Sequence, residues 1–211
     1  MHVENSNSQN VNYTITSCQR GTSQGSYRIY LEDGSSFFLS IDFFISKKLA
    51  KGVTVNQELL SEIKEESLFV EAYIKAISLL SRQLYTRFKL KTKLISKGFD
   101  ICGVEKSLEF LEEQGYINDK VYAEKWVSSR IRNKLDSYNI LLAGLMNKGI
   151  NASICKDVLN ELYTEEVNEL IIEKSIIKQL KLNKSHDEII KILVRKGFDI
   201  RKVQNNLHNN T

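Results

Sequence analysis

The chain has 211 residues, of which 42% are hydrophobic and 27% charged, and its net charge is +4. This length is enough for one large or two small domains with buried cores. No apolar run approaches the roughly 20 residues that span a bilayer, and the first ten residues lack a secretory signal pattern, so we expect a cytoplasmic protein that makes no membrane contact. The three cysteines and three histidines show no C-x-x-C pair and no metal-ligand spacing, which argues against disulfides and zinc.

The N-terminal quarter differs in composition from the remainder. Residues 1–10 are polar and predict a disordered tail. Within residues 11–60, the segments YTITSCQ, SYRIYL and SFFLSI are short, β-branched and aromatic, and Asp33-Gly34 between the last two is a strong hairpin signal. We predict a small antiparallel β subdomain here, followed by a short helix that ends at Gly52 and a second helix, QELLSEIKEES, that leads into the next domain.

One phrase occurs three times in the rest of the chain, as LISKGFDI at 94–101, LMNKGINA at 145–152 and LVRKGFDI at 193–200. Each copy has the residues needed to end one helix and begin another. A glycine suited to the left-handed conformation is followed two residues later by an N-cap side chain. These turn residues are Gly98 and Asp100, Gly149 and Asn151, and Gly197 and Asp199.

The spacing of the three glycines indicates a repeat array, because a period near 50 residues is typical of one supersecondary unit copied in tandem. Apolar residues also recur eight and four positions before each glycine, at Leu90 and Leu94 in the first copy. We therefore predict a mainly α protein: three tandem three-helix repeats in an elongated array, preceded by the small antiparallel β subdomain. The expected repeats are residues 61–117, 118–163 and 164–211.

Catalytic motifs are absent from the sequence. It contains no G-x-G-x-x-G, no P-loop, no H-E-x-x-H and no plausible nucleophile–histidine arrangement. The tempting SHDE at 185–188 is explained as a capping box, in which Ser185 and Glu188 begin a helix. We predict no catalytic residue, no bound cofactor and no metal, and hence a protein that is not an enzyme.

Positive charge is unevenly distributed. Residues 72–99 contain no acidic side chain but seven basic ones. Lys89, Lys93 and Lys97, named here the basic stripe, fall on one side of a helix, beside the apolar edge of Leu90 and Leu94. This imbalance favours an anionic partner, either nucleic acid or an acidic protein surface. Further basic residues recur in the second and third repeats: Lys125, Arg130, Arg132 and Lys134, then Lys174, Lys178 and Lys181.

Trp126 could stack on a nucleic-acid base, since it lies one helical turn before Arg130. Its neighbours Val121, Ala123 and Val127 favour a place in the core instead. We therefore predict no aromatic and basic platform for single strands.

Two stretches resemble the RecX family, the regulatory proteins that modulate the bacterial RecA recombinase. AISLLSRQLYTRFKLKTKLISKGFD is similar to the family's Leu-Ser-Arg, basic helix and Leu-x-x-Lys-Gly, and LEFLEEQGYINDKVYAEKWVSSRI to its Leu-x-x-x-Gly-Tyr-Leu-x-Asp-x-x-x-Ala. The chain departs from the family in having Lys89 where a glutamate is common and LDSY at 135–138 where a glycine is usual. The positions that match in the second stretch are Gly115, Tyr116, Asn118, Asp119, Tyr122 and Ala123, with Ile117 in place of leucine.

We expect a monomer, because each repeat buries its apolar stripe against a neighbouring repeat. The resemblance implies a protein of DNA repair, homologous recombination and the SOS response. Such a protein binds the RecA–DNA filament, binds single-stranded DNA only weakly by itself, and inhibits ATP hydrolysis, strand exchange and filament extension. One alternative is a helical repeat module that binds DNA or RNA directly, and another is a scaffold without an anionic partner. Charge selects the candidate filament-facing or DNA-facing residues: Arg82, Arg87, Lys89, Lys93, Lys97, Lys125, Arg130 and Arg132.

Overall fold

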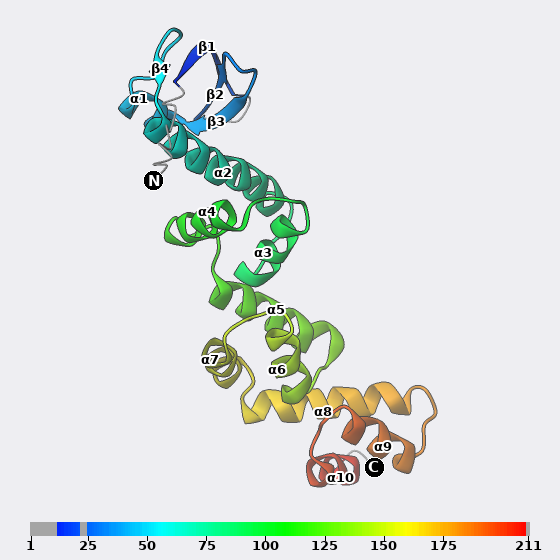
Figure 1. The fold of residues 1–211 in the computed structure, drawn as a ribbon. Helices are drawn as coiled ribbons and strands as arrows, with labels where there is room; N and C mark the ends of the chain where they lie inside the picture. The colour runs from blue at the N-terminus through cyan, green and yellow to red at the C-terminus, as the bar shows by residue number, and fades with distance from the viewer. Residues whose placement is uncertain (1–11, 22–24, 210–211) are drawn as a thin grey trace, which may run out of the picture. The chain divides into compact units, whose positions relative to one another are not determined.

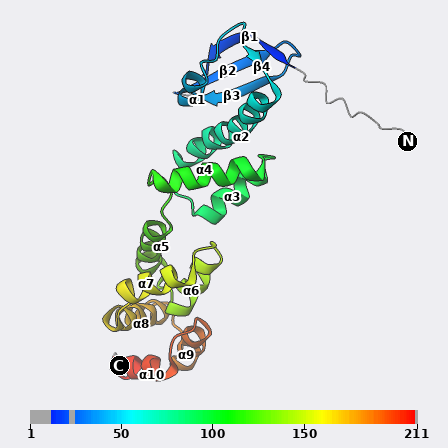
Figure 2. The same ribbon diagram turned by 60° about the vertical axis from the view of Figure 1, so that its left-hand side comes forward.

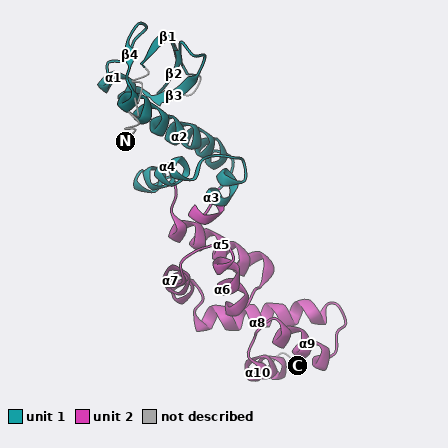
Figure 3. Ribbon diagram, in the orientation of Figure 1, with its two compact units in different colours: residues 1–83, 90–116 teal, residues 84–89, 117–211 magenta. Residues whose placement is uncertain are grey.

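The computed structural model describes residues 12–21 and 25–209, so the expected disordered tail lies outside the described residues. The chain divides into two compact units (Figure 3). Unit 1 comprises residues 1–83 and 90–116, and unit 2 comprises residues 84–89 and 117–211. Helix α3 (Arg87–Ile95) thus contributes its first residues to unit 2 and the remainder to unit 1.

Unit 1 begins with the predicted antiparallel sheet (Figures 1 and 2). Its strands are β1 (Tyr13–Arg20), β2 (Ser26–Leu31), β3 (Ser36–Ser40) and the short β4 (Thr54–Val55), which the sequence did not predict; their order is β3-β2-β1-β4. The hairpin at Asp33-Gly34 is confirmed: Gly34 has a φ of +84° and its N–H donates to the carbonyl of Leu31. Ile15, Ile29 and Leu39 are fully buried in the core beneath the sheet.

The short helix after the sheet ends earlier than predicted. Helix α1 is Ile41–Ser46, and Lys48 then takes the left-handed conformation with a φ of +50°. This reversal lets Leu49 enter the core of the β subdomain, where it is 4% exposed and its N–H donates to the carbonyl of Phe44. Gly52, at φ +89°, lies instead in the turn that leads into β4.

The helix predicted at QELLSEIKEES (57–67) and the first helix of the predicted repeat at 61–117 form one continuous helix, α2 (Gln57–Leu80). Its N-terminal half buries Leu60 and Ile63 against the sheet, and its C-terminal half packs on α4 (Ile101–Glu113). Propensity explains the continuity, because the segment contains no glycine or proline at which a helix would end. The predicted boundary at residue 61 therefore falls inside a helix.

The remaining helices follow in groups of three. They are α5 (Asp119–Lys134), α6 (Tyr138–Met146), α7 (Ala152–Leu162), α8 (Glu165–Leu180), α9 (His186–Arg195) and α10 (Ile200–Asn209). Helices α5, α6 and α7 pack around one core, and α8, α9 and α10 around another. Each core is built from the apolar positions that the sequence predicted, since Leu141, Leu145, Ile189 and Leu193 have no exposed surface. The exact repeat boundaries stay a prediction.

The repeated phrase forms the same turn each time. Gly98, Gly149 and Gly197 have φ values of +87°, +76° and +85°, as predicted. The residue after each glycine donates its N–H to a carbonyl five residues back, which is the bond of a Schellman stop. These bonds are Phe99 to Leu94 at 3.3 Å, Ile150 to Leu145 at 3.3 Å and Phe198 to Leu193 at 3.2 Å. The predicted N-cap carboxylates and amide also bind the next helix: Asp100 Oδ1 accepts from Gly103, Asn151 Oδ1 from Ser153 and Asp199 Oδ1 from Arg201.

Within unit 2, a buried hydroxyl links each of two such turns to an earlier helix start. The Thr86 hydroxyl accepts from the N–H of Lys89 at 3.2 Å and donates to the Lys148 carbonyl at 2.7 Å, immediately before Gly149. The Ser137 hydroxyl accepts from Ile140 in the same way and donates to the Lys196 carbonyl. Thr86 and Ser137 are 0% and 1% exposed, so their hydroxyl groups depend on these protein partners rather than on water. The repeated turn therefore also connects successive repeats.

The LDSY segment, where the family usually has a glycine, makes its turn with a leucine. Leu135 has a φ of +54° and donates its N–H to the carbonyl of Arg130. A left-handed leucine costs on the order of 1–2 kcal/mol. Its side chain packs against the core of α8, α9 and α10, and the neighbouring Asp136 pairs with Arg130. Tertiary packing thus holds a conformation that propensity disfavours.

Alanine at the turn glycines should separate backbone strain from crowding. A Cβ at Gly98 meets no atom within 4 Å, whereas one at Gly149 would overlap the Cβ of Phe88. We expect Gly98→Ala to lower the free energy of unfolding by about 1–2 kcal/mol, from strain alone, and Gly149→Ala to lower it by at least twice as much. Urea unfolding followed by circular dichroism measures both, and equal losses would contradict the close packing at Gly149.

Removing the buried hydroxyl of Thr86 should lower the free energy of unfolding by more than removing an ordinary helix N-cap does. Thr86→Val keeps the shape but leaves the Lys148 carbonyl and the Lys89 N–H without this partner, so we expect a loss of roughly 2–4 kcal/mol in the free energy of unfolding. Thr86→Ser retains the hydroxyl and serves as the control, with an expected loss below about 1 kcal/mol. If the two variants unfold at the same urea concentration, the hydroxyl does not link the repeats.

Candidate basic interface

Two lysines of the basic stripe, Lys89 and Lys93, lie on the solvent side of α3, and Lys97 lies in the turn that follows the helix. Lys89, Lys93 and Lys97 are exposed, while Leu90 and Leu94 between them have no exposed surface. Lys89 and Lys93 are four residues apart in α3, so both project from one side of the helix. None of the three forms an ion pair with another described residue; the Lys89 ammonium lies 5.6 Å from the Phe88 ring centre. The stripe is therefore available for an anionic partner.

The surface around α3 is less positive in the folded protein than the sequence of residues 72–99 suggests. Lys91 pairs with Glu105 of α4, an acid that lies beyond the basic segment in sequence. Lys91 is thereby neutralised on the side of α3 that meets α4. The lysines of the basic stripe keep their charge because they point away from this contact.

The other candidate residues fall into exposed and constrained groups. Arg82 is exposed in the turn that precedes α3, and Lys125 and Arg132 are exposed on α5, seven residues apart and hence on one side of it. Arg130 lies about 140° around the α5 axis from Lys125, at 100° per residue. Arg130 pairs with Asp136, whose side chain is 9% exposed, so its guanidinium has a structural role.

Arg87 is held by Asp119, a residue of the motif shared with the RecX family. The backbone N–H of Arg87, at the start of α3, donates to Asp119 Oδ1 at 2.9 Å. Burial raises the pKa of Asp119 above its ordinary value, and the Arg87 N–H and guanidinium charge oppose this rise only in part. Asp119 thus fixes where α3 begins and where its first basic side chain projects.

The rest of the motif also has structural roles. Gly115 has a φ of +73° and forms another Schellman stop, in which Tyr116 donates to Leu111 at 2.8 Å. Asn118 caps α5 by accepting from Val121 at 3.0 Å, and Ala123 is fully buried beneath it. These residues build the entry to α5 rather than a binding surface.

Trp126 is half-buried and packs against the core of α5, α6 and α7, as predicted, but it also contacts cations. The Arg130 guanidinium carbon lies 5.4 Å and the Lys148 ammonium 5.3 Å from its ring, and Lys148 is also 5.6 Å from the ring of Tyr122. The sequence did not predict these cation contacts, and the absence of a platform for single strands stays a prediction. The sequence could not reveal this contact, because Lys148, in the turn after α6, and Trp126, on α5, meet only in the folded chain.

Neither a metal site nor a membrane span is found in the part of the chain that the structure describes. No group of three or more histidine, cysteine, aspartate or glutamate side chains there could hold a metal ion. Similarly, no helix among these residues is both long and apolar enough to cross a bilayer.

The fold and the basic face define a helical-repeat protein with a small β subdomain, and comparison with known proteins places it more closely. The family description "RecX, first three-helix domain" matches residues 72–111. "Regulatory protein RecX" of Clostridioides difficile (strain 630) is 32% identical over 191 residues, which cover 86% of this chain and 89% of that protein. The chain belongs to the family of RecX regulatory proteins.

Other relatives agree with this assignment. "Regulatory protein RecX" of Clostridium acetobutylicum is 31% identical over 152 residues, covering 69% of this chain and 70% of that protein. The solved "Crystal structure of regulatory protein RecX" superimposes with a TM-score of 0.75 at 25% identity and covers 92% of this chain and 99% of that chain. RecX from Lactobacillus salivarius gives a TM-score of 0.60, also at 25% identity, over 67% of this chain and 96% of that chain. The predicted fold class is confirmed.

The raised pKa of Asp119 predicts an unusual pH dependence. Because its pKa is raised, the Asp119 carboxyl binds its proton more tightly in the folded than in the unfolded protein. Ionisation of Asp119 therefore destabilises the folded protein as pH rises through the aspartate range and above it. Asp119→Asn cannot ionise, yet its amide oxygen still accepts from Arg87. We therefore expect the free energy of unfolding of Asp119→Asn, relative to the unaltered protein, to increase between pH 3 and pH 7 in urea titrations.

Asp119→Ala provides the control, because it removes the acceptor as well as the charge. It should be less stable than Asp119→Asn at every pH, by about 1 kcal/mol for the lost cap of α3. A stability difference between Asp119→Asn and the unaltered protein that shrinks with rising pH would mean that attraction to the Arg87 guanidinium outweighs burial.

Proposed function

We propose that this protein binds the RecA–DNA filament and inhibits the recombinase: ATP hydrolysis, strand exchange and filament extension. In this proposal it acts in the cytoplasm as a monomer and binds single-stranded DNA only weakly by itself. Membership of the RecX regulatory family supports the proposal, because members are named regulators and the family resemblance implies the recombinase as their target. The exposed basic stripe is the single structural observation that supports it most directly.

Charge explains how the stripe would act. A RecA–DNA filament presents phosphate groups and acidic protein surfaces, and lysines without intramolecular ion pairs can approach them without first losing a partner. We propose Arg82, Lys93 and Lys97 as contact residues in unit 1 and Lys89, Lys125 and Arg132 in unit 2. Arg87 and Arg130 remain proposed contacts, although Asp119 and Asp136 restrict their positions.

Inhibition requires more than binding. A ligand shifts filament assembly only by the difference between its affinities for the assembled and dissociated states. The protein must therefore bind a filament conformation or a filament end more tightly than it binds free recombinase subunits. Capping, disassembly and binding along the filament groove all satisfy this requirement and differ in where the added protein stops growth.

Direct binding of DNA or RNA by the helical repeats is the second candidate function. The cluster of Trp126, Arg130 and Lys148 favours it, because an aromatic ring beside two cations is a feature of single-strand binding sites. The packing of Trp126 against the core weighs against it, since the buried part of the indole cannot stack on a base.

Reversing the charge of the basic stripe tests the proposal. We expect Lys89→Glu/Lys93→Glu/Lys97→Glu to raise the concentration that half-inhibits the single-stranded-DNA-dependent ATPase of the cognate recombinase by about 10-fold or more. The matched control is Lys51→Glu/Lys64→Glu/Lys156→Glu, which alters the net charge equally at three exposed lysines elsewhere. Equal inhibition by the two variants would exclude the basic stripe from the interface.

The same proteins are titrated against fluorescent single-stranded DNA without recombinase, and anisotropy is recorded over a range of salt concentrations. Inhibition well below the concentration that saturates bare DNA supports a filament-directed regulator. Inhibition that begins only as bare DNA saturates, with affinity that falls steeply with salt, supports the direct nucleic-acid module instead.

A further inference from the structure

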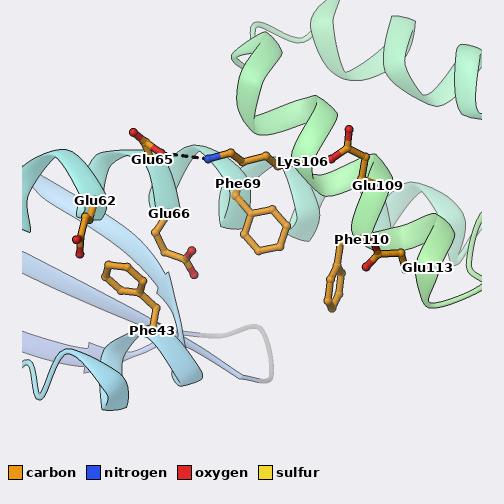
Figure 4. Close-up of a pocket in the computed structure, with 9 residues that line it drawn as sticks. All are labelled: Phe43, Glu62, Glu65, Glu66, Phe69, Lys106, Glu109, Phe110 and Glu113. Atoms are coloured by element: carbon orange, nitrogen blue, oxygen red, sulfur yellow. Dashed lines mark hydrogen bonds and ion pairs between the residues drawn. The ribbon is translucent and has the colours of Figure 1, made fainter.

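Unit 1 has a second surface whose charge is opposite to that of the basic stripe. Two adjoining hollows, of about 440 Å³ and 660 Å³, lie between α2, α4 and the segment of β3 and α1. They share Glu66, Phe69 and Phe110, and together they are named here the aromatic–acidic groove (Figure 4). The first hollow is lined by the carboxylates of Glu62, Glu65, Glu66, Glu109 and Glu113, by Phe43, Phe69 and Phe110, and by Lys106.

The close approach of two helices builds this groove. Gly103 of α4 lies against the backbone of Leu68 on α2, and a Cβ at Gly103 would overlap the Leu68 carbonyl. Lys106 then reaches from α4 to Glu65 of α2, at 3.1 Å. This packing fixes α4 beside α2 and projects Phe69 and Phe110 into the groove from opposite helices.

The aromatic rings of the groove form a cluster that solvent reaches. Phe110 packs edge-on against Phe69 and Tyr73, with ring centres 5.9 Å and 5.6 Å apart. Phe110 is nevertheless 38% exposed, and Tyr116, which lines the second hollow, is 57% exposed. Clustered and exposed aromatic side chains are typical of protein interaction sites, because they bury a large area on binding at a small entropic cost.

The carboxylates divide into paired and unpaired groups. Glu62 pairs with Lys47, Glu65 with Lys106, and Glu66 accepts from the backbone N–H and hydroxyl of Ser40. Glu109 and Glu113 form no ion pair among the described residues. They are four residues apart on α4, so the two negative charges repel each other on one side of the helix. A cation bound in the groove would relieve this repulsion.

We propose that the aromatic–acidic groove binds a segment of a partner protein in which arginine or lysine alternates with apolar side chains. Charge complementarity selects this partner, because five carboxylates offset by only Lys47 and Lys106 repel phosphate groups but attract cationic side chains. The aromatic rings add a second contribution, since guanidinium and ammonium groups bind over their faces and leucine-sized side chains fill the space between them. The proposal does not depend on the basic stripe contacting the filament.

A labelled peptide measures this binding directly. The probe is a fluorescein-labelled peptide of four arginine–leucine repeats, and anisotropy is recorded with the full-length protein. We expect Glu109→Lys/Glu113→Lys to raise the Kd for the peptide by about 10-fold or more, because like charges then face each other. Both carboxylates are exposed, so the substitutions should leave the fold intact. The control Glu32→Lys/Glu169→Lys changes the net charge equally at two exposed sites outside the groove and should alter the Kd by less than about 2-fold.

A peptide of four arginine–serine repeats tests the aromatic contribution. It has the same charge, and we expect it to bind at least about 5-fold more weakly because the rings have no apolar side chain to contact. Equal Kd values for the two peptides, or for the groove and control variants, would overturn the proposal. A protein that self-associates in sedimentation and becomes monomeric on Glu109→Lys/Glu113→Lys would overturn it in favour of a second copy as the occupant.

Discussion

The buried hydroxyls of Thr86 and Ser137 are the interaction on which the succession of repeats in unit 2 depends. Each hydroxyl begins one helix and at the same time satisfies the carbonyl that precedes the turn glycine of a later repeat. A buried hydroxyl without a partner costs about 1–3 kcal/mol, so each of these helix starts needs the turn of a later repeat to satisfy its hydroxyl. The phrase repeated in the sequence is therefore both a helix terminus and a point of contact between repeats. Nearest-neighbour contacts of this kind are how repeat proteins gain stability.

The same turns also place charged side chains on the surface. Asp119 accepts from the first N–H of α3, and this bond sets the rotation of the helix that bears the basic stripe. Leu90 and Leu94 hold the neighbouring side of α3 in the core, which leaves Lys89 and Lys93 exposed to solvent. Folding and the proposed binding thus use different sides of one short helix. A change on the inner side would alter the position of the basic stripe, whereas a change on the outer side would leave the core unaffected.

Helix α3, whose residues are divided between the two units, presents the basic stripe, and unit 1 presents the aromatic–acidic groove of opposite charge. The basic stripe suits an anionic filament, and the aromatic–acidic groove suits a cationic protein segment. A net charge of +4 conceals this division, because the sum over the chain contains no information about where each sign gathers. Separate surfaces for unlike partners would let a regulator contact more than one component of an assembly, each with its own salt dependence.

The sequence by itself determined the repeated turns, the helix caps, the hairpin and the exposed side of α3, because each of these depends on residues within a few positions of one another. Tertiary structure decided what distant residues do together. It paired Lys91 with Glu105, placed Lys148 and Arg130 beside Trp126, held Leu135 in a left-handed conformation, and merged two expected helices into α2. It also joined Phe69 and Phe110 in a groove that no local pattern indicates. Periodicity reports the faces of single helices, whereas these features arise where two elements meet, and that geometry is set by packing.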